Sequence, residues 1–159
     1  MTIKSSRGFV AASIVAVVCL LTACDRATVY NHYEQTQSSG WERNDTLVFH
    51  LPKLKEGGTY KEEVGLRINS EFPFMAIALI VEQEIFPSGE TLSDTLYATL
   101  ANKRGDVLGR GISLFQYMFD LTTLQLREND SIQVNIRHNM KREILPGLSD
   151  VGIKLRRIK

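Results

Sequence analysis

The residue whose chemistry is most clearly specified by its neighbours is Cys24, the thiol that ends the run Leu21-Thr22-Ala23-Cys24. A branched aliphatic residue, two small residues and a cysteine match a lipobox, in which the thiol receives diacylglycerol before cleavage between Ala23 and Cys24. The small residues are needed because the signal peptidase must approach the backbone. We therefore expect lipid attachment at Cys24 and signal peptidase recognition through Leu21, Thr22 and Ala23.

A basic start and a short apolar run precede this motif. Lys4 and Arg7 supply the positive charge, and the apolar segment 8–23 is shorter than the roughly 20 residues that a membrane-spanning helix needs. Residues 1–23 are therefore predicted to be a lipoprotein signal peptide that is removed. Each buried acyl methylene contributes about 0.8 kcal/mol, and a bacterial lipoprotein carries about three chains, so the mature chain should stay attached to its membrane.

Cleavage also simplifies the chemistry of the mature chain. Cys19 is removed and Cys24 is acylated, so no thiol is left for a disulfide bond or a thiolate metal site. The formal charge of the whole sequence is +1, and cleavage takes away Lys4 and Arg7. The mature chain therefore has no basic excess for nucleic acid, and we expect no nucleic-acid partner.

Two carboxylates have a spacing that could suit acid–base catalysis. Glu82 and Glu84 alternate in a strand pattern, so their side chains emerge on the same face about 7 Å apart. Glycoside hydrolysis would need an apolar pocket that keeps one of them protonated, and the neighbouring residues indicate no such asymmetry. A solvated strand face explains the pair more simply, and we expect no catalytic residue.

Histidine and serine residues give no stronger indication of a site. His32, His50 and His138 are scattered over separate segments, without the spacing that lets two imidazoles share a metal ion. Ser88 and Ser131 lack a Gly-x-Ser-x-Gly nucleophile elbow, and turn chemistry accounts for both. We predict no metal site, no cofactor and no small-molecule substrate.

Aromatic and basic residues leave two alternatives open. Trp41, Tyr97 and Tyr117 could stack on sugar rings, although a lone tryptophan more often closes the end of a sandwich core. The basic segment 154–159 could contact anionic lipid headgroups, where each charge adds about 1 kcal/mol. The alternation of Val151 with its neighbours favours a final strand with a solvated basic face instead.

From residue 46 onward, apolar residues recur with a period of two, which indicates half-buried strands and no helix of useful length. Segment 74–86 is apolar on both faces through its first half, as expected for a central strand. Gly105, Gly109 and Gly111 indicate a bulge or a close backbone approach. The predicted strands cover residues 46–51, 64–69, 74–86, 91–100, 112–119, 121–126, 131–136 and 151–156.

About eight short strands separated by Gly, Pro and Asn turns favour an all-β fold, an antiparallel β-sandwich of the jelly-roll type, with a barrel as the alternative. We assign residues 41–159 to this sandwich. Residues 24–40 form a lipid-anchored N-terminal segment. We expect part of that segment to dock, since a free tether would not need the large rings of Tyr30 and Tyr33.

Several short motifs together resemble the gliding motility-associated lipoprotein GldH, a family found in Bacteroidetes. The order and spacing of these motifs over the mature chain carry the resemblance. The chain between residues 115 and 126 departs from the family pattern. The motifs are Val29-Tyr30 with Tyr33, Trp41 before Asn44-Asp45, Leu66-Arg67 with Asn69, Phe72-Pro73-Phe74, Phe86-Pro87-Ser88-Gly89 before Asp94-Thr95-Leu96, Leu108-Gly109 with Gly111, His138 with Met140, and 147–152.

This resemblance implies an envelope lipoprotein that supports cell movement over surfaces and acts with other lipoproteins of the gliding and type IX secretion apparatus. It implies no enzymatic activity and no cofactor. Asp25-Arg26-Ala27 lacks the acidic cluster that marks lipoproteins for surface export in this phylum, so we expect a periplasm-facing anchor. The alternative is an envelope glycan-binding β-sandwich module of a non-gliding bacterium.

Overall fold

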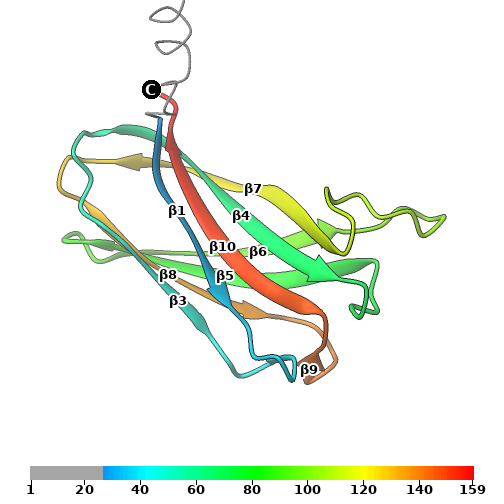
Figure 1. Ribbon diagram of the computed structural model, residues 1–159. Helices are drawn as coiled ribbons and strands as arrows, with labels where there is room; N and C mark the ends of the chain where they lie inside the picture. The colour runs from blue at the N-terminus through cyan, green and yellow to red at the C-terminus, as the bar shows by residue number, and fades with distance from the viewer. Residues whose placement is uncertain (1–26) are drawn as a thin grey trace, which may run out of the picture.

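The computed structural model describes residues 27–159, which form two four-stranded β-sheets packed face to face and one short two-stranded sheet (Figure 1). No helix in this part of the chain is long and apolar enough to cross a membrane. The strands are β1 (Thr28–Gln35), β2 (Trp41–Glu42), β3 (Leu47–Leu51), β4 (Gly58–Asn69), β5 (Ala76–Phe86), β6 (Glu90–Thr99), β7 (Leu114–Leu126), β8 (Ser131–His138), β9 (Ile144–Leu145) and β10 (Leu148–Arg157).

The strand order is that of a jelly roll. The first sheet has the order β1-β10-β4-β7 and the second has the order β3-β8-β5-β6, with every pair antiparallel. Successive long strands therefore alternate between the sheets, apart from the β5–β6 hairpin. The predicted all-β, antiparallel sandwich is confirmed, and the short β2–β9 pair closes one end of it.

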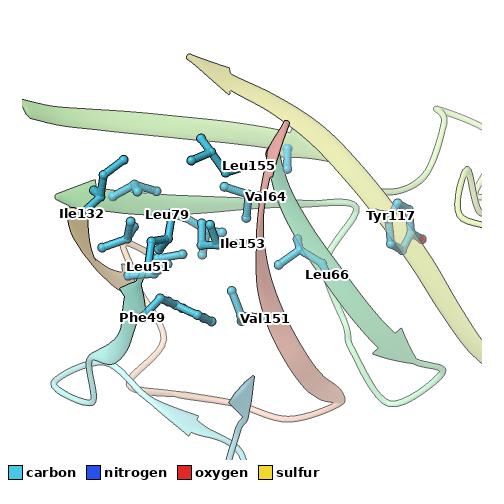
Figure 2. Close-up of a cluster of buried hydrophobic side chains, with 14 of the residues drawn as sticks. Phe49, Leu51, Val64, Leu66, Leu79, Tyr117, Ile132, Val151, Ile153 and Leu155 are labelled. Carbon is cyan, nitrogen blue, oxygen red and sulfur yellow. The ribbon is translucent and has the colours of Figure 1, made fainter. Parts of the chain in front are cut away.

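The core lies between the two sheets, where alternate residues of each strand point inward (Figure 2). Val64 and Leu66 of β4 and Ile153 of β10 are completely buried, and Leu79 of β5 is completely buried in the opposite sheet. Burying a side chain of this size contributes about 1.5–3 kcal/mol. Residues 27–159 contain no cysteine, so this packing holds the sheets together without a disulfide bond.

The prediction of two strands between residues 112 and 126 is wrong, because the structure has one strand there. β7 pairs continuously with β4, but Glu62 pairs with Thr122 and Glu63 with Asp120, which leaves Leu121 as an extra residue. Such a β-bulge shifts the inward-facing positions by one residue. The alternation of inward and outward residues therefore changes phase at Leu121. A prediction that follows alternation with a period of two then finds two strands where the structure has one.

The β4 strand begins at Gly58, six residues before the predicted start at residue 64. Tyr60 and Glu62 point inward like Val64, but a buried carboxylate interrupts the apolar alternation that predicts strands. At the N-terminus, β1 pairs with β10 from Thr28 to Gln35, so the first sheet starts before Trp41.

Candidate functional site on the outer face of the first sheet

Cys24, the predicted lipid site, and the predicted signal peptide over residues 1–23 lie outside the described residues. Lipid attachment at Cys24 therefore stays a prediction. The described chain begins just after it: the backbone N–H of Arg157 donates a hydrogen bond of 2.8 Å to the carbonyl of Ala27. The start of β1 thus lies beside the C-terminal end of β10 (Figure 1).

Glu82 and Glu84 share the outer face of β5, as predicted. Arg137 Nη2 lies 3.2 Å from Glu82 Oε1, and the Glu82 side chain is about half exposed. Each of the two acidic residues has polar register partners on β8, Asn135 for Glu82 and Gln133 for Glu84. This is the solvated strand face that the sequence favours, and it provides no apolar pocket for a protonated catalytic acid.

The three histidines lie on three different strands, β1, β3 and β8. Within residues 27–159, no group of three or more His, Cys, Asp or Glu side chains is placed to hold a metal ion. His32 contacts Glu34, with 2.9 Å between Nε2 and Oε1. Ser88 donates its hydroxyl to the carbonyl of Ile85, 3.1 Å away, which is the turn role predicted for it.

The three candidate sugar-stacking rings do not form a platform. Trp41 is 0% exposed and Tyr117 is 7% exposed, while Tyr97 is 77% exposed. The interpretation of all three as a stacking surface is therefore wrong, since buried rings cannot reach a sugar. Trp41 instead closes the sandwich end, edge-on to the ring of His138 at 5.3 Å between centroids.

The most organised polar cluster lies on the outer face of the first sheet, around Tyr33. Tyr33 of β1 is the register partner of Gly152 on β10, which is in turn the partner of Gly65 on β4. A Cβ atom on either glycine would lie 2.7 Å from the Tyr33 ring, at Cζ for Gly65 and at Cδ1 for Gly152. The tyrosine ring therefore lies directly on two backbones, which only glycine permits.

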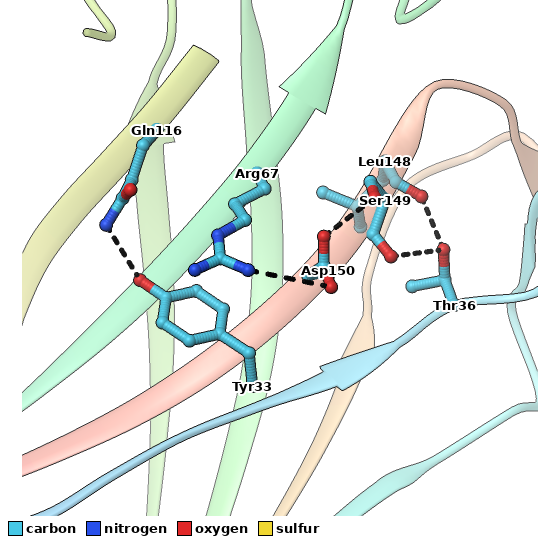
Figure 3. Close-up of polar contacts among 7 residues, drawn as sticks. All are labelled: Tyr33, Thr36, Arg67, Gln116, Leu148, Ser149 and Asp150. Atoms are coloured by element: carbon cyan, nitrogen blue, oxygen red, sulfur yellow. Dashed lines mark hydrogen bonds and ion pairs between the residues drawn. The ribbon is translucent and has the colours of Figure 1, made fainter. Parts of the chain in front are cut away.

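Polar partners hold the Tyr33 ring in this position (Figure 3). The Arg67 guanidinium carbon lies 4.1 Å from the ring centroid, a cation–π distance. Gln116 Nε2 donates to the phenolic oxygen at 3.3 Å, and Arg67 Nη1 lies 3.9 Å from Asp150 Oδ1. Ser149 Oγ donates to Asp150 Oδ2 at 2.7 Å. We call Tyr33, Arg67, Gln116, Ser149 and Asp150 the tyrosine clamp.

The tyrosine clamp fits a mechanical role better than a chemical one. Burial raises the pKa of the Tyr33 phenol above its ordinary value, and the nearby Arg67 charge opposes this rise without reversing it. The phenol therefore stays protonated near neutral pH and is a poor nucleophile. The clamp residues come from all four strands of the first sheet, so their contacts cross its whole width.

Sequence reasoning did not find the tyrosine clamp as a site, although it marked Tyr33 as a docking residue. A usable signal was present: Gly65 and Gly152 each interrupt a strand pattern, and glycine in a strand often marks a close backbone approach. Sequence alone does not show that Gly65 and Gly152 are register partners. It is this pairing that places both glycine backbones under the Tyr33 ring.

Residues 28–155 match the family model described as GldH lipoprotein. The chain belongs to this family. "Gliding motility lipoprotein GldH" of Flavobacterium johnsoniae is 30% identical over 98% of both chains. "Gliding motility lipoprotein GldH homolog" of Christiangramia forsetii is 24% identical over 89% of this chain and 91% of its own. The predicted GldH resemblance is thereby confirmed.

Several residues that carry the resemblance to the GldH family meet in space. Tyr33, Arg67 and Asp150 come from motifs far apart in the sequence and contact one another in the tyrosine clamp. Trp41 and His138 come from two other motifs and pack together at the sandwich end, where His138 Nε2 lies 3.2 Å from the carbonyl of Trp41. The motifs thus position structural contacts of the sandwich.

Proposed function

We propose that this chain is a lipid-anchored, non-catalytic protein of the cell envelope that supports gliding motility by holding other lipoproteins of the gliding and type IX secretion apparatus. Membership of the GldH family supports the link to gliding. The envelope side, the partners and the absence of catalysis are our proposal.

The observation that carries this proposal is how early the folded domain begins. Thr28 is already part of β1, and β1 pairs with the C-terminal strand as far as Gln35. Only about four residue steps separate Thr28 from Cys24, so a lipid on Cys24 would hold the start of β1 within about 14 Å of the membrane surface. The sandwich would then be a fixed platform and not a domain on a long tether.

A non-catalytic role agrees with the engagement of the polar residues. Glu82 faces Arg137 on an open sheet, and the tyrosine clamp residues contact one another. Acid–base catalysis needs a group whose protonation is tuned for a bound substrate, and neither arrangement supplies one. For the envelope side, we propose a periplasm-facing anchor, because Asp25-Arg26-Ala27 after the lipobox lacks an acidic export cluster.

The anchor is tested by Cys24→Ser in cells labelled with a palmitate analogue. We expect loss of labelling and an uncleaved or mislocalised precursor, because serine cannot take part in thioether formation. Cys19→Ser is the matched control, since it changes a thiol in the same segment and should keep full labelling. Retained labelling in Cys24→Ser would refute the lipid assignment.

The holding role is tested by affinity capture from mildly solubilised membranes, which should recover gliding or secretion lipoproteins. Recovery of the bait alone would count against it. The non-catalytic role is tested separately with the double variant Glu82→Gln and Glu84→Gln. We expect unchanged spreading on agar, and a loss of spreading with normal protein levels would point to catalysis.

A further inference from the structure

The edge strands of the two large sheets are protected to different degrees. An exposed edge presents backbone groups that can pair with another chain, and proteins normally block it with short strands, prolines, bulges or charged residues. β3 has five residues and is followed by Pro52, and β1 has a register shift between Thr28 and Tyr30. β7 carries the bulge at Leu121, and Arg110 bridges to its edge at Gln116.

The remaining edge, β6, is long, has no bulge, and carries only two charged residues, Glu90 and Asp94. Its ten residues pair with β5 in unbroken register from Glu90 to Thr99. It contains no proline, lysine or arginine. Within residues 27–159, no strand pairs with its other side, so alternate backbone N–H and C=O groups of β6 point away from the sheet.

The inward-facing row of β6 indicates which side chains an added strand should carry. Leu92 and Leu96 are only partly buried against the core, so their outer sides would be covered by apolar residues of a new neighbour. Asp94 lies between them and is half-buried, and its carboxylate makes no hydrogen bond or ion pair within the described part of the chain. A lysine or arginine opposite Asp94 would supply the missing counter-charge.

One end of this edge borders an open groove. The groove has a volume of about 610 Å³ and is lined by Thr99 at the end of β6, by Leu108 and Arg110 of the following loop, and by residues 116–119 of β7 in the other sheet. Phe119 is also only partly buried. An added strand beside β6 would lie next to this groove at its Thr99 end.

A second copy of this chain fits the edge poorly. A two-fold dimer through β6 would pair the strands antiparallel and keep inward residues opposite inward residues. In one of the two longest such overlaps, Leu92 faces Leu96 and Asp94 faces Asp94 of the other copy. Like charges directly opposite each other destabilise a sheet. Moving one copy along the edge by two residues places Asp94 opposite Leu92 or Leu96 of the other copy, so that its charge has no partner.

We propose that β6 is a strand-addition site for an extended segment of another envelope protein, with inward apolar residues on both sides of a central lysine or arginine. Main-chain hydrogen bonds would supply the affinity, and Asp94 with its flanking leucines would supply the selectivity. This inference rests on the proposed holding role, but it is measured on the purified chain. A failed anchor would appear in the palmitate labelling and would leave strand binding intact.

The test uses the detergent-solubilised mature chain and two synthetic ten-residue peptides. Both peptides alternate threonine with valine, and the central inward position is lysine in one peptide and glutamate in the other. Binding is followed by titration, and its place by hydrogen exchange. We expect protection of residues 90–99 and a preference of roughly tenfold or more for the lysine peptide, since the change converts an opposite-charge pair into a like-charge pair.

Two matched variants locate the preference. Asp94→Asn should reduce the preference to near onefold without abolishing binding, because only the charge is lost. Glu34→Gln removes a half-buried charge from the edge strand β1 and should leave the preference unchanged. The proposal is overturned by absence of protection at millimolar peptide, by equal binding of both peptides to the native chain, or by concentration-dependent dimers that disappear in Asp94→Lys.

Discussion

A buried carboxyl group between the sheets makes this fold sensitive to pH in a way that can be measured. Glu62 of β4 is 0% exposed, and Gln83 of β5, in the opposite sheet, is 2% exposed. Gln83 Nε2 donates a hydrogen bond to Glu62 Oε2, while Oε1 of each side chain has no partner. If Glu62 is protonated on Oε1, it can donate to Gln83 Oε1, and the two buried oxygens satisfy each other.

The electrostatics favour that protonated form. Burial raises the pKa of Glu62 from 4.5 to about 8; the hydrogen bond from Gln83 opposes the rise, and the nearby Asp94 adds to it. Between pH 4.5 and 8 the folded chain therefore holds a proton that the unfolded chain has lost. Stability from this group is fully present below pH 4.5 and is lost as the pH rises to about 8.

The size of the effect follows from proton linkage. A full difference of one bound proton changes the free energy of unfolding by about 1.4 kcal/mol per pH unit. With the pKa of Glu62 near 8, the contribution falls by about 2–3 kcal/mol between pH 5 and pH 7. This is a large fraction of the 5–15 kcal/mol that is typical of a folded domain.

Glu62→Gln isolates this contribution, because the amide keeps the shape and can still exchange hydrogen bonds with Gln83. Denaturant unfolding of both chains from pH 5 to pH 7.5 should show the variant gaining about 2–3 kcal/mol on the native chain as the pH rises. Glu63→Gln is the matched control, since Glu63 faces outward toward Lys61 and Lys154. Native and Glu62→Gln curves that run parallel over this pH range would refute the reasoning.

Three further variants test other parts of the sandwich. Gly65→Ala should cost about 1–3 kcal/mol in denaturant unfolding because its Cβ displaces the Tyr33 ring, and the same cost in a Tyr33→Ala background would contradict this cause. Trp41→Ala should cost about 3–5 kcal/mol by opening the sandwich end, and a loss under 1 kcal/mol would exclude that role. Burial lowers the pKa of His138, so its stabilisation is present above pH 6.5 and is lost on acidification. In denaturant unfolding over this pH range, His138→Gln should reduce the loss in free energy of unfolding that occurs as the pH falls.

Strand alternation predicted the sandwich because most inward positions are apolar and most outward positions are polar. The same rule failed where an inward position is polar or the register changes. The polar Glu62 interrupts the apolar alternation, so the first half of β4 was not predicted as a strand. The extra residue Leu121 made β7 look like two strands. Each failure has a physical cause that one strand alone does not reveal, since burial of Glu62 depends on Gln83 in the other sheet.

The predicted lipid anchor and the tyrosine clamp differ in how far sequence could define them. The lipobox is a contiguous motif that a peptidase reads in an extended chain, so its four residues are sufficient for a prediction. The tyrosine clamp joins Tyr33, Arg67, Gln116 and Asp150, which are separated by long stretches of sequence. Only the sheet register brings them together, and register is fixed by packing of the whole core.

The jelly-roll order also relates the proposed anchor to the proposed strand-addition site. β1 packs against β3 at one side of the sandwich, and β6 packs against β7 at the other side. Three strand spacings of about 4.8 Å therefore separate the two sides, roughly 14 Å across the sheet. A lipid on Cys24 would tether the β1 side, so a partner strand could reach β6 without displacing the anchored strand. With both proposals, this separation would let one small domain hold the membrane and a partner at the same time.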